Sequence, residues 1–123
     1  VETDAMDREL LAGIFRALKP GGGLWFTAPS AVGMLADLEA HPDFDPVTFR
    51  EEFTLDIEGR DGNPQTLACS QRYYIFPELK CILEHLGFTQ VKFFAVTGSG
   101  YQRGVPLSGD HFELGVSAVK HSH

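Results

Sequence analysis

The sequence is poor in the residues that mark several classes of protein. Its two cysteines, Cys69 and Cys81, stand twelve positions apart with no second pair, which fits neither a zinc site nor a disulfide framework. We therefore expect the reduced thiols of a cytoplasmic protein. No apolar run approaches the roughly 18 residues of a membrane helix, and the N-terminus shows no signal-peptide pattern, so we expect no membrane partner.

Basic residues are also scarce. Ten Lys and Arg stand against 17 Asp and Glu, and residues 1–60 carry the whole excess, with twelve acids and five bases. An acidic surface repels phosphate backbones, so nucleic acid is not an expected partner. The histidines lack the short spacings that metal ligands use, and no metal site is expected.

What remains is an ordinary globular composition. The chain has 123 residues, of which 43% are hydrophobic and 22% charged. This length and balance predict one domain with a real core.

The first half opens with a helix and a strand. Leu11, Ile14, Phe15 and Leu18 repeat at helical spacing, which predicts a helix over 4–18 with Asp4 as its N-cap. Pro20 and three glycines end it. Residues 24–28 are continuously apolar, which favours a central parallel strand covered on both faces.

A hairpin and a third helix follow. Ser30 can cap a second helix that ends near His41. Alternation over 53–58 and an extended run over 66–74, separated by turn formers at 59–64, predict a β-hairpin. Pro77 suits the start of a helix that Gly87 ends in a left-handed conformation.

Two strands close the chain. Runs over 91–96 and 112–119 are rich in β-formers, and the connection between them shows no helical period, so they are expected to be antiparallel neighbours. The glycine-rich stretch 98–104 superficially offers a cofactor loop. We interpret it as a connection, because no helix follows it.

Three patterns in this order resemble the second half of a class I S-adenosylmethionine-dependent methyltransferase. They are Leu18 to Phe26 (Leu-Lys-Pro-Gly-Gly-Gly-Leu-Trp-Phe), Arg72 to Phe88 with its Gly-Phe ending, and the closing Val-Ser-Ala-Val-Lys. The resemblance implies an α/β fold, the C-terminal half of a Rossmann-like sheet with strands five, seven and six, the last antiparallel, flanking helices and an inserted β-hairpin. Residues 1–123 would form one partial domain, with 31–70 as a variable insertion that could act as a substrate lid.

The resemblance also implies what the chain lacks. In that family the residues that bind S-adenosylmethionine precede the position of Asp4, so none is expected here, and the chain starting at Val1 looks truncated. The complete parent would use S-adenosylmethionine, whereas this chain alone is expected to be inactive. The Phe-rich insertion, with Phe44, Phe49 and Phe53, suits an apolar small-molecule acceptor.

Five residues are candidates for the substrate side of the sheet. Pro29 and Ser30 follow the strand at the carboxyl edge where open α/β sheets bind ligands, although Ser30 also suits a helix cap. Arg72, Tyr73 and Tyr74 could orient an anionic or phenolic acceptor, or simply pack a strand. Catalytic residues are not assigned, because His111 or Asp110 would serve as a base only if it faced the cleft.

Three functions remain open from the sequence. The chain is half of an enzyme, or a non-catalytic fragment serving as an interaction module, or an unrelated α+β binding domain. An exposed edge of the strand at 24–28 would invite pairing. The expected partner is therefore the missing N-terminal half or a self-associating copy, with that strand or the first helix at the interface.

Overall fold

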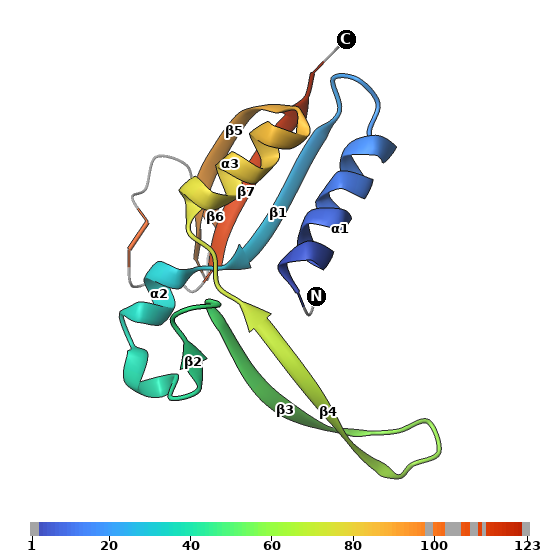
Figure 1. Cartoon of the computed structure of the whole chain (residues 1–123), viewed down its shortest axis with the longest axis vertical. Coiled ribbons are helices and arrows are strands. Elements are labelled where there is room, and N and C mark those ends of the chain that lie inside the picture. The colour runs from blue at the N-terminus through green and yellow to red at the C-terminus, as the bar shows by residue number, and fades with distance from the viewer. Residues whose placement is uncertain (1–2, 98–99, 103–106, 109–110, 112, 122–123) are drawn as a thin grey trace.

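The computed structural model describes residues 3–97, 100–102, 107–108, 111 and 113–121. Two antiparallel sheets, with strand orders β1-β7-β5-β6 and β2-β3-β4, are joined at one corner (Figure 1). The elements run in this order: α1 (Asp4–Ala17), β1 (Gly23–Pro29), α2 (Ala31–Leu35), a 3₁₀ turn η1 (Leu38–Ala40), β2 (Phe44–Asp45), β3 (Arg50–Glu58), β4 (Pro64–Arg72), α3 (Phe76–Leu86), β5 (Phe88–Thr97), β6 (Gly100–Gln102) and β7 (Glu113–Lys120).

The predicted half of a Rossmann-like sheet is wrong. Every strand pairing among the described residues is antiparallel, and the single parallel contact there is an isolated bridge between Ser30 and Tyr74. The strand expected to be central and parallel is β1, whose only described sheet partner is β7. The protein is a mixed α/β structure of two small antiparallel sheets.

The apolar run in β1 has a different physical cause from the one expected. Alternate residues face the core: Ala28 belongs to the core cluster, and Leu24 and Phe26 are partly buried against it. Trp25, in contrast, is 52% exposed and packs against Phe94 at 4.8 Å between ring centres. A continuous apolar run therefore does not identify a parallel strand. The expected antiparallel pairing of the last two strands is confirmed, since β7 pairs with β5.

The helix α1 is fixed at both ends by contacts that the sequence pattern did not indicate. Its N-cap is Thr3, whose Oγ1 accepts the Met6 N–H at 3.1 Å, and not Asp4. At the other end Lys120 Nζ donates to the carbonyl oxygens of Phe15 and Leu18, at 2.7 and 2.9 Å. A cation on the last strand thus satisfies the free carbonyls of the first helix.

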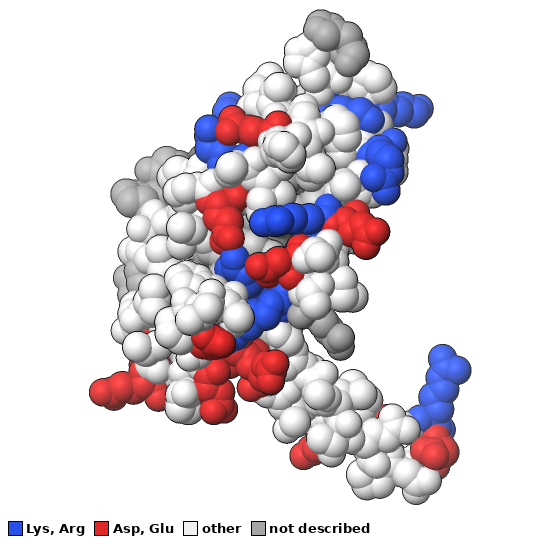
Figure 2. Space-filling model, in the orientation of Figure 1, with Lys and Arg blue, Asp and Glu red and all other residues white. Residues whose placement is uncertain are grey.

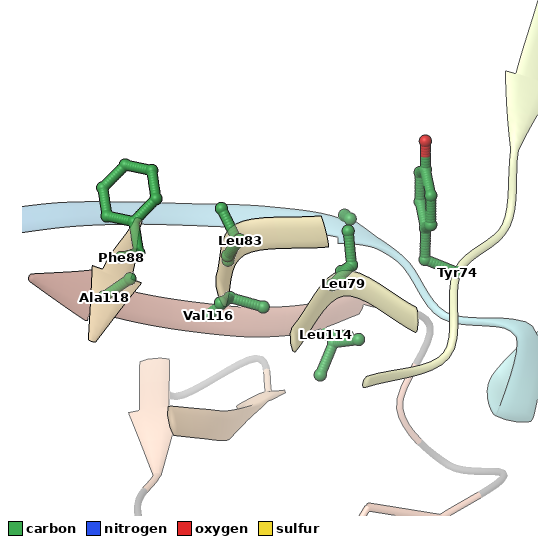
Figure 3. Close-up of a cluster of buried hydrophobic side chains, with 8 residues drawn as sticks. Tyr74, Leu79, Leu83, Phe88, Leu114, Val116 and Ala118 are labelled. Atoms are coloured by element: carbon green, nitrogen blue, oxygen red, sulfur yellow. The ribbon is translucent and has the colours of Figure 1, made fainter. Parts of the chain in front are cut away.

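The main core lies between the four-stranded sheet and the helices α1 and α3. Figure 3 shows its buried side chains in a row, with Tyr74 at one end beside Leu79. Gly87 ends α3 with φ of 111°, the left-handed conformation expected from the sequence. The core cluster consists of Ala28, Tyr74, Leu79, Leu83, Phe88, Leu114, Val116 and Ala118.

The predicted hairpin is confirmed and projects from the body as an arm, residues 50–72 (Figure 1). Its alternation does not reflect burial, because the apolar side chains along it are about 40% exposed, among them Leu55 at 47% and Leu67 at 44%. The helix expected from Ser30 to His41 is broken into α2 and η1.

Of the glycine-rich stretch 98–104, the structure describes only residues 100–102, which form the short strand β6 paired with β5. The rest of the stretch, which we interpreted from the sequence as a connection, lies outside the described residues. Along the described part of the chain, no helix has both the length and the apolar character needed to cross a bilayer.

Candidate functional site

The chain leaves the body after β1 and returns to the same point more than forty residues later. The Tyr74 N–H donates to the Pro29 carbonyl and the Ala31 N–H donates to the Tyr74 carbonyl, both at 2.9 Å. These bonds surround the isolated bridge between Ser30 and Tyr74. The five candidate residues, separated in sequence, are thereby brought to one corner of the fold.

A cavity of about 300 Å³ opens at this corner between α1, β1, β4 and α3; we call it the α1/β1 pocket. Three of the five candidates line it, namely Pro29, Arg72 and Tyr74, while Ser30 and Tyr73 do not. Half of the lining is apolar, and it comes from both helices and the strand: Leu10, Leu11, Phe26, Ala28, Pro29 and Leu79.

The phenol of Tyr74 is tied to a carboxylate at the pocket wall. Its hydroxyl donates to Asp7 Oδ2, on the first helix. Burial, and then this hydrogen bond to Asp7, raise the pKa of Tyr74 above its ordinary value of 10.0. Tyr74 is therefore a neutral phenol at any physiological pH.

Arg72 is held on all sides at the rim of the same pocket. Its guanidinium lies 4.4 Å from the centre of the Tyr74 ring and donates to the Tyr73 carbonyl, to Glu78 at 2.5 Å and to Asp4 at 3.2 Å. Two carboxylates neutralise it. The positive charge of the guanidinium is therefore already balanced, and Arg72 would attract an anionic ligand only weakly.

A second arginine completes an ionic network at the base of the arm. Arg50 lies 3.1 Å from Asp4 and 3.6 Å from Asp7, and its Nη1 donates to Ser70 Oγ at 3.1 Å. Burial raises the pKa of Asp4, but the bonds to Arg50 and Arg72 outweigh it and the pKa is lowered overall. Figure 2 shows such basic and acidic side chains interleaved in the middle of this face.

Tyr73 belongs to a separate cluster on the other side of the chain. It packs with Ala31 and Met34, and its hydroxyl donates to Glu51 Oε1 at 3.0 Å. Burial and this bond raise the pKa of Tyr73 to about 12. His41 Nδ1 lies 3.0 Å from the same carboxylate. This cluster joins the arm to α2 and contributes nothing to the pocket.

The other candidates have structural positions. Ser30 is 2% exposed and precedes α2 at the N-cap position, without a side-chain capping bond. His111 is buried, and its Nδ1 accepts the Ser108 N–H at 3.1 Å, away from the pocket lining. Asp110 lies outside the described residues.

The phenylalanines of the insertion do not line the pocket either. Phe44 and Phe49 pack beside Tyr73, with ring centres 5.4 Å apart, and Phe53 lies on the arm. The expectation that these three rings form an acceptor site is not met in the α1/β1 pocket.

Sequence reasoning missed Asp7. This carboxylate stands four residues before Leu11 and eleven before Leu18, on the same stripe of the helix that packs on the core. The position of a carboxylate on an apolar stripe could have indicated its role, because a charged group next to the core needs a partner there. The partner, Tyr74, is 67 residues away.

Comparison with known proteins does not assign the chain to a family. No protein-family model matches it, and no curated protein matches it either.

Proposed function

We propose that this chain is the acceptor-binding portion of an S-adenosylmethionine-dependent methyltransferase that acts on a small molecule. The α1/β1 pocket carries the proposal. Its volume of about 300 Å³ lies at the lower end of the range of small-molecule sites, and an apolar lining with a few polar groups is typical of them. The family named in the proposal comes from the resemblance of three sequence patterns, Leu18 to Phe26, Arg72 to Phe88 and the closing Val-Ser-Ala-Val-Lys.

The pocket's residues would bind and orient the acceptor. Leu11, Phe26 and Leu79 supply an apolar lining that would exclude water, while Tyr74 and Asp7 present fixed polar atoms to the ligand. Positioning and desolvation provide most of the acceleration in a transfer of this kind, so few catalytic side chains are needed. S-adenosylmethionine would supply the methyl group.

The described residues do not fit that cofactor. The first turn of α1 carries Asp4 and Asp7, and that of α3 carries Glu78, so neither helix N-terminus offers free positive potential to an anionic group. We therefore propose that the cofactor is bound by residues other than those that the structure describes, as the resemblance implies. On this proposal the chain alone is inactive.

Two measurements test the proposal. Calorimetric titration of the chain with S-adenosylhomocysteine should give no binding heat, and methyl transfer by the chain alone would contradict its assigned inactivity. The natural protein or complex that contains the chain, isolated with an antibody against it, should transfer a tritiated methyl group from S-adenosylmethionine to a small molecule. Isolated material that transfers no label contradicts the proposal.

A second candidate function is an interaction module, which the position of β1 at the edge of its sheet favours. Along its length β1 has one described sheet partner, β7, and an unpaired edge can take another strand. The partner would be a missing N-terminal half or a second copy. Light scattering at high concentration should then show a dimer or larger oligomer, and a clean monomer would count against the second copy. The free thiols of Cys69 and Cys81 agree with a cytoplasmic location for either function.

A further inference from the structure

We infer that the α1/β1 pocket binds an uncharged, apolar compound through one hydroxyl or N–H group, which donates a hydrogen bond to Asp7 beside the Tyr74 oxygen. The inference rests on the proposed function and names its acceptor class. A phenol is the simplest member of that class.

Two polar groups at the pocket wall, the Asp7 carboxylate and the Tyr74 oxygen, can still accept a hydrogen bond. The Tyr74 proton is already donated to Asp7, and Arg72 donates to Tyr73, Asp4 and Glu78. A carboxylate has about four lone-pair sites and a phenolic oxygen keeps its own lone pairs after donating. Thr27, Ser70 and Gln71 also line the pocket, but each can donate or accept, so none of them decides the ligand's polarity.

The charges at the pocket disfavour ions of either sign. An anion would approach the Asp7 carboxylate, and the guanidinium that lines the pocket, Arg72, is neutralised by two carboxylates. A cation would have to compete with Arg50, which lies 3.6 Å from Asp7. It would also lose its hydration against Leu11 and Phe26, which is costly unless it is fully paired. A neutral donor group avoids both penalties.

The hydrogen bonds of Arg72 and the tyrosines distinguish two acceptor classes, anionic and phenolic, that the sequence alone cannot distinguish. Arg72 with two tyrosines is equally suited to an anionic and to a phenolic acceptor when only the residue types are known. In the structure the arginine is engaged and the second tyrosine, Tyr73, donates to Glu51 on another cluster. What remains for the ligand is the pair of Tyr74 and Asp7.

The test compares two probes of nearly equal shape, 4-propylphenol and its methyl ether 4-propylanisole. Each is titrated into the chain while backbone amide signals are followed by NMR. The phenol should shift the amides of Asp7, Thr27 and Gln71 and bind about tenfold more tightly than the ether, which lacks the donor. Equal affinities, no binding of the phenol, or shifts confined to other residues would overturn the inference.

Variants assign the effect to the carboxylate. Asp7→Ala should abolish the preference for the phenol, whereas Glu84→Ala, which removes an exposed carboxylate paired with Lys80 on α3, should leave it unchanged. A preference that survives in Asp7→Ala contradicts the inference. Should Asp7→Ala fail to fold, the comparison of the two probes on the unaltered chain decides.

The probes contain no cofactor, so the inference and the proposed function fail separately. If the chain prefers the phenol but the isolated natural protein transfers no methyl group, the proposed methyltransferase function is overturned and the inferred binding site is retained. Methyl transfer together with equal binding of the two probes would retain the methyltransferase and overturn the acceptor class.

Discussion

Arg50 and Arg72 stand directly opposite each other on β3 and β4, and both donate to the same oxygen, Oδ1 of Asp4, at 3.1 and 3.2 Å. Like charges in opposed positions of an antiparallel ladder destabilise it. Asp4 therefore ties the base of the arm to the first helix and offsets the repulsion between the two guanidinium groups.

We expect Asp4→Asn to lower the free energy of unfolding by about 1 kcal/mol, a modest value because the Asp4 side chain is 48% exposed and the pairs are screened. The pKa of Asp4 is lowered in the folded state, so its contribution is present above 3.8, the unperturbed value, and is lost as the pH falls through the folded pKa.

Urea denaturation at neutral pH and below the Asp4 pKa measures this difference. The gap between the parent chain and Asp4→Asn should close in acid. Glu84→Gln, at the exposed pair on α3, should lie close to the parent at neutral pH. A gap for Asp4→Asn that persists unchanged in acid would show that the carboxylate charge is not its cause.

Tyrosine ionisation should be delayed by the two buried phenols. The sequence has three tyrosines, and the pKa is raised for Tyr74 and, to about 12, for Tyr73. Stability from Tyr73 is complete below 10.0, the unperturbed pKa, and is lost as the pH rises towards 12. Tyrosinate absorbance followed in Tyr73→Phe should lack the step near 12. A variant that titrates like the parent would contradict this assignment.

Gly115 permits a close contact in the main sheet. A Cβ built there would lie 2.1 Å from Cε2 of Phe94, a ring that is 2% exposed and has no room to move away. Gly115→Ala should therefore destabilise the protein by about 1–3 kcal/mol, the usual cost of overpacking.

A matched glycine gives the opposite expectation. Gly13 lies inside α1, and a Cβ there would meet only Arg16 Nη2, at an ordinary 3.7 Å. Gly13→Ala should stabilise the protein by about 0.5–1 kcal/mol. Thermal unfolding of both variants checks the pair, and the same sign of change in both would refute the steric argument.

The outer part of the arm should be dispensable for the stability of the body. Residues 54–68 are exposed or nearly so, so replacing them with a two-residue Asn-Gly turn between Phe53 and Cys69, which face each other, keeps the ladder in register. Unfolding of the body should change by no more than about 0.5 kcal/mol. A larger loss by urea denaturation would reveal contacts between the arm and the body.

The sequence could predict the features whose causes are local. Gly87 ends α3 because a left-handed residue needs no Cβ, and the turn formers at 59–64 separate two strands that pair in the expected way. The class of the sheet could not be predicted in this way. An apolar run such as 24–28 reports that side chains are covered, but not whether the neighbouring strand runs parallel or antiparallel.

The candidate site could be predicted only in part, for a related reason. Pro29 was found because it follows a recognisable strand, and Arg72 and Tyr74 because the family resemblance implied that they lie on the substrate side of the sheet. Asp7 was missed because its role depends on a partner 67 residues away. Likewise, the alternation in the arm indicated a strand but could not show that the Leu55 side chain would remain exposed.

The crossing at Pro29, Ala31 and Tyr74 has a consequence for how this protein can vary. The segment between Ala31 and Tyr74 leaves and rejoins the body at one point, where two backbone hydrogen bonds join its ends. Its two ends therefore lie side by side whatever the sequence between them. Closure entropy grows only slowly with the length of such a segment. A shorter, longer or unrelated segment could therefore be grafted between the same two anchors, which would exchange one wall of the pocket while β1, α3 and the core stay as they are.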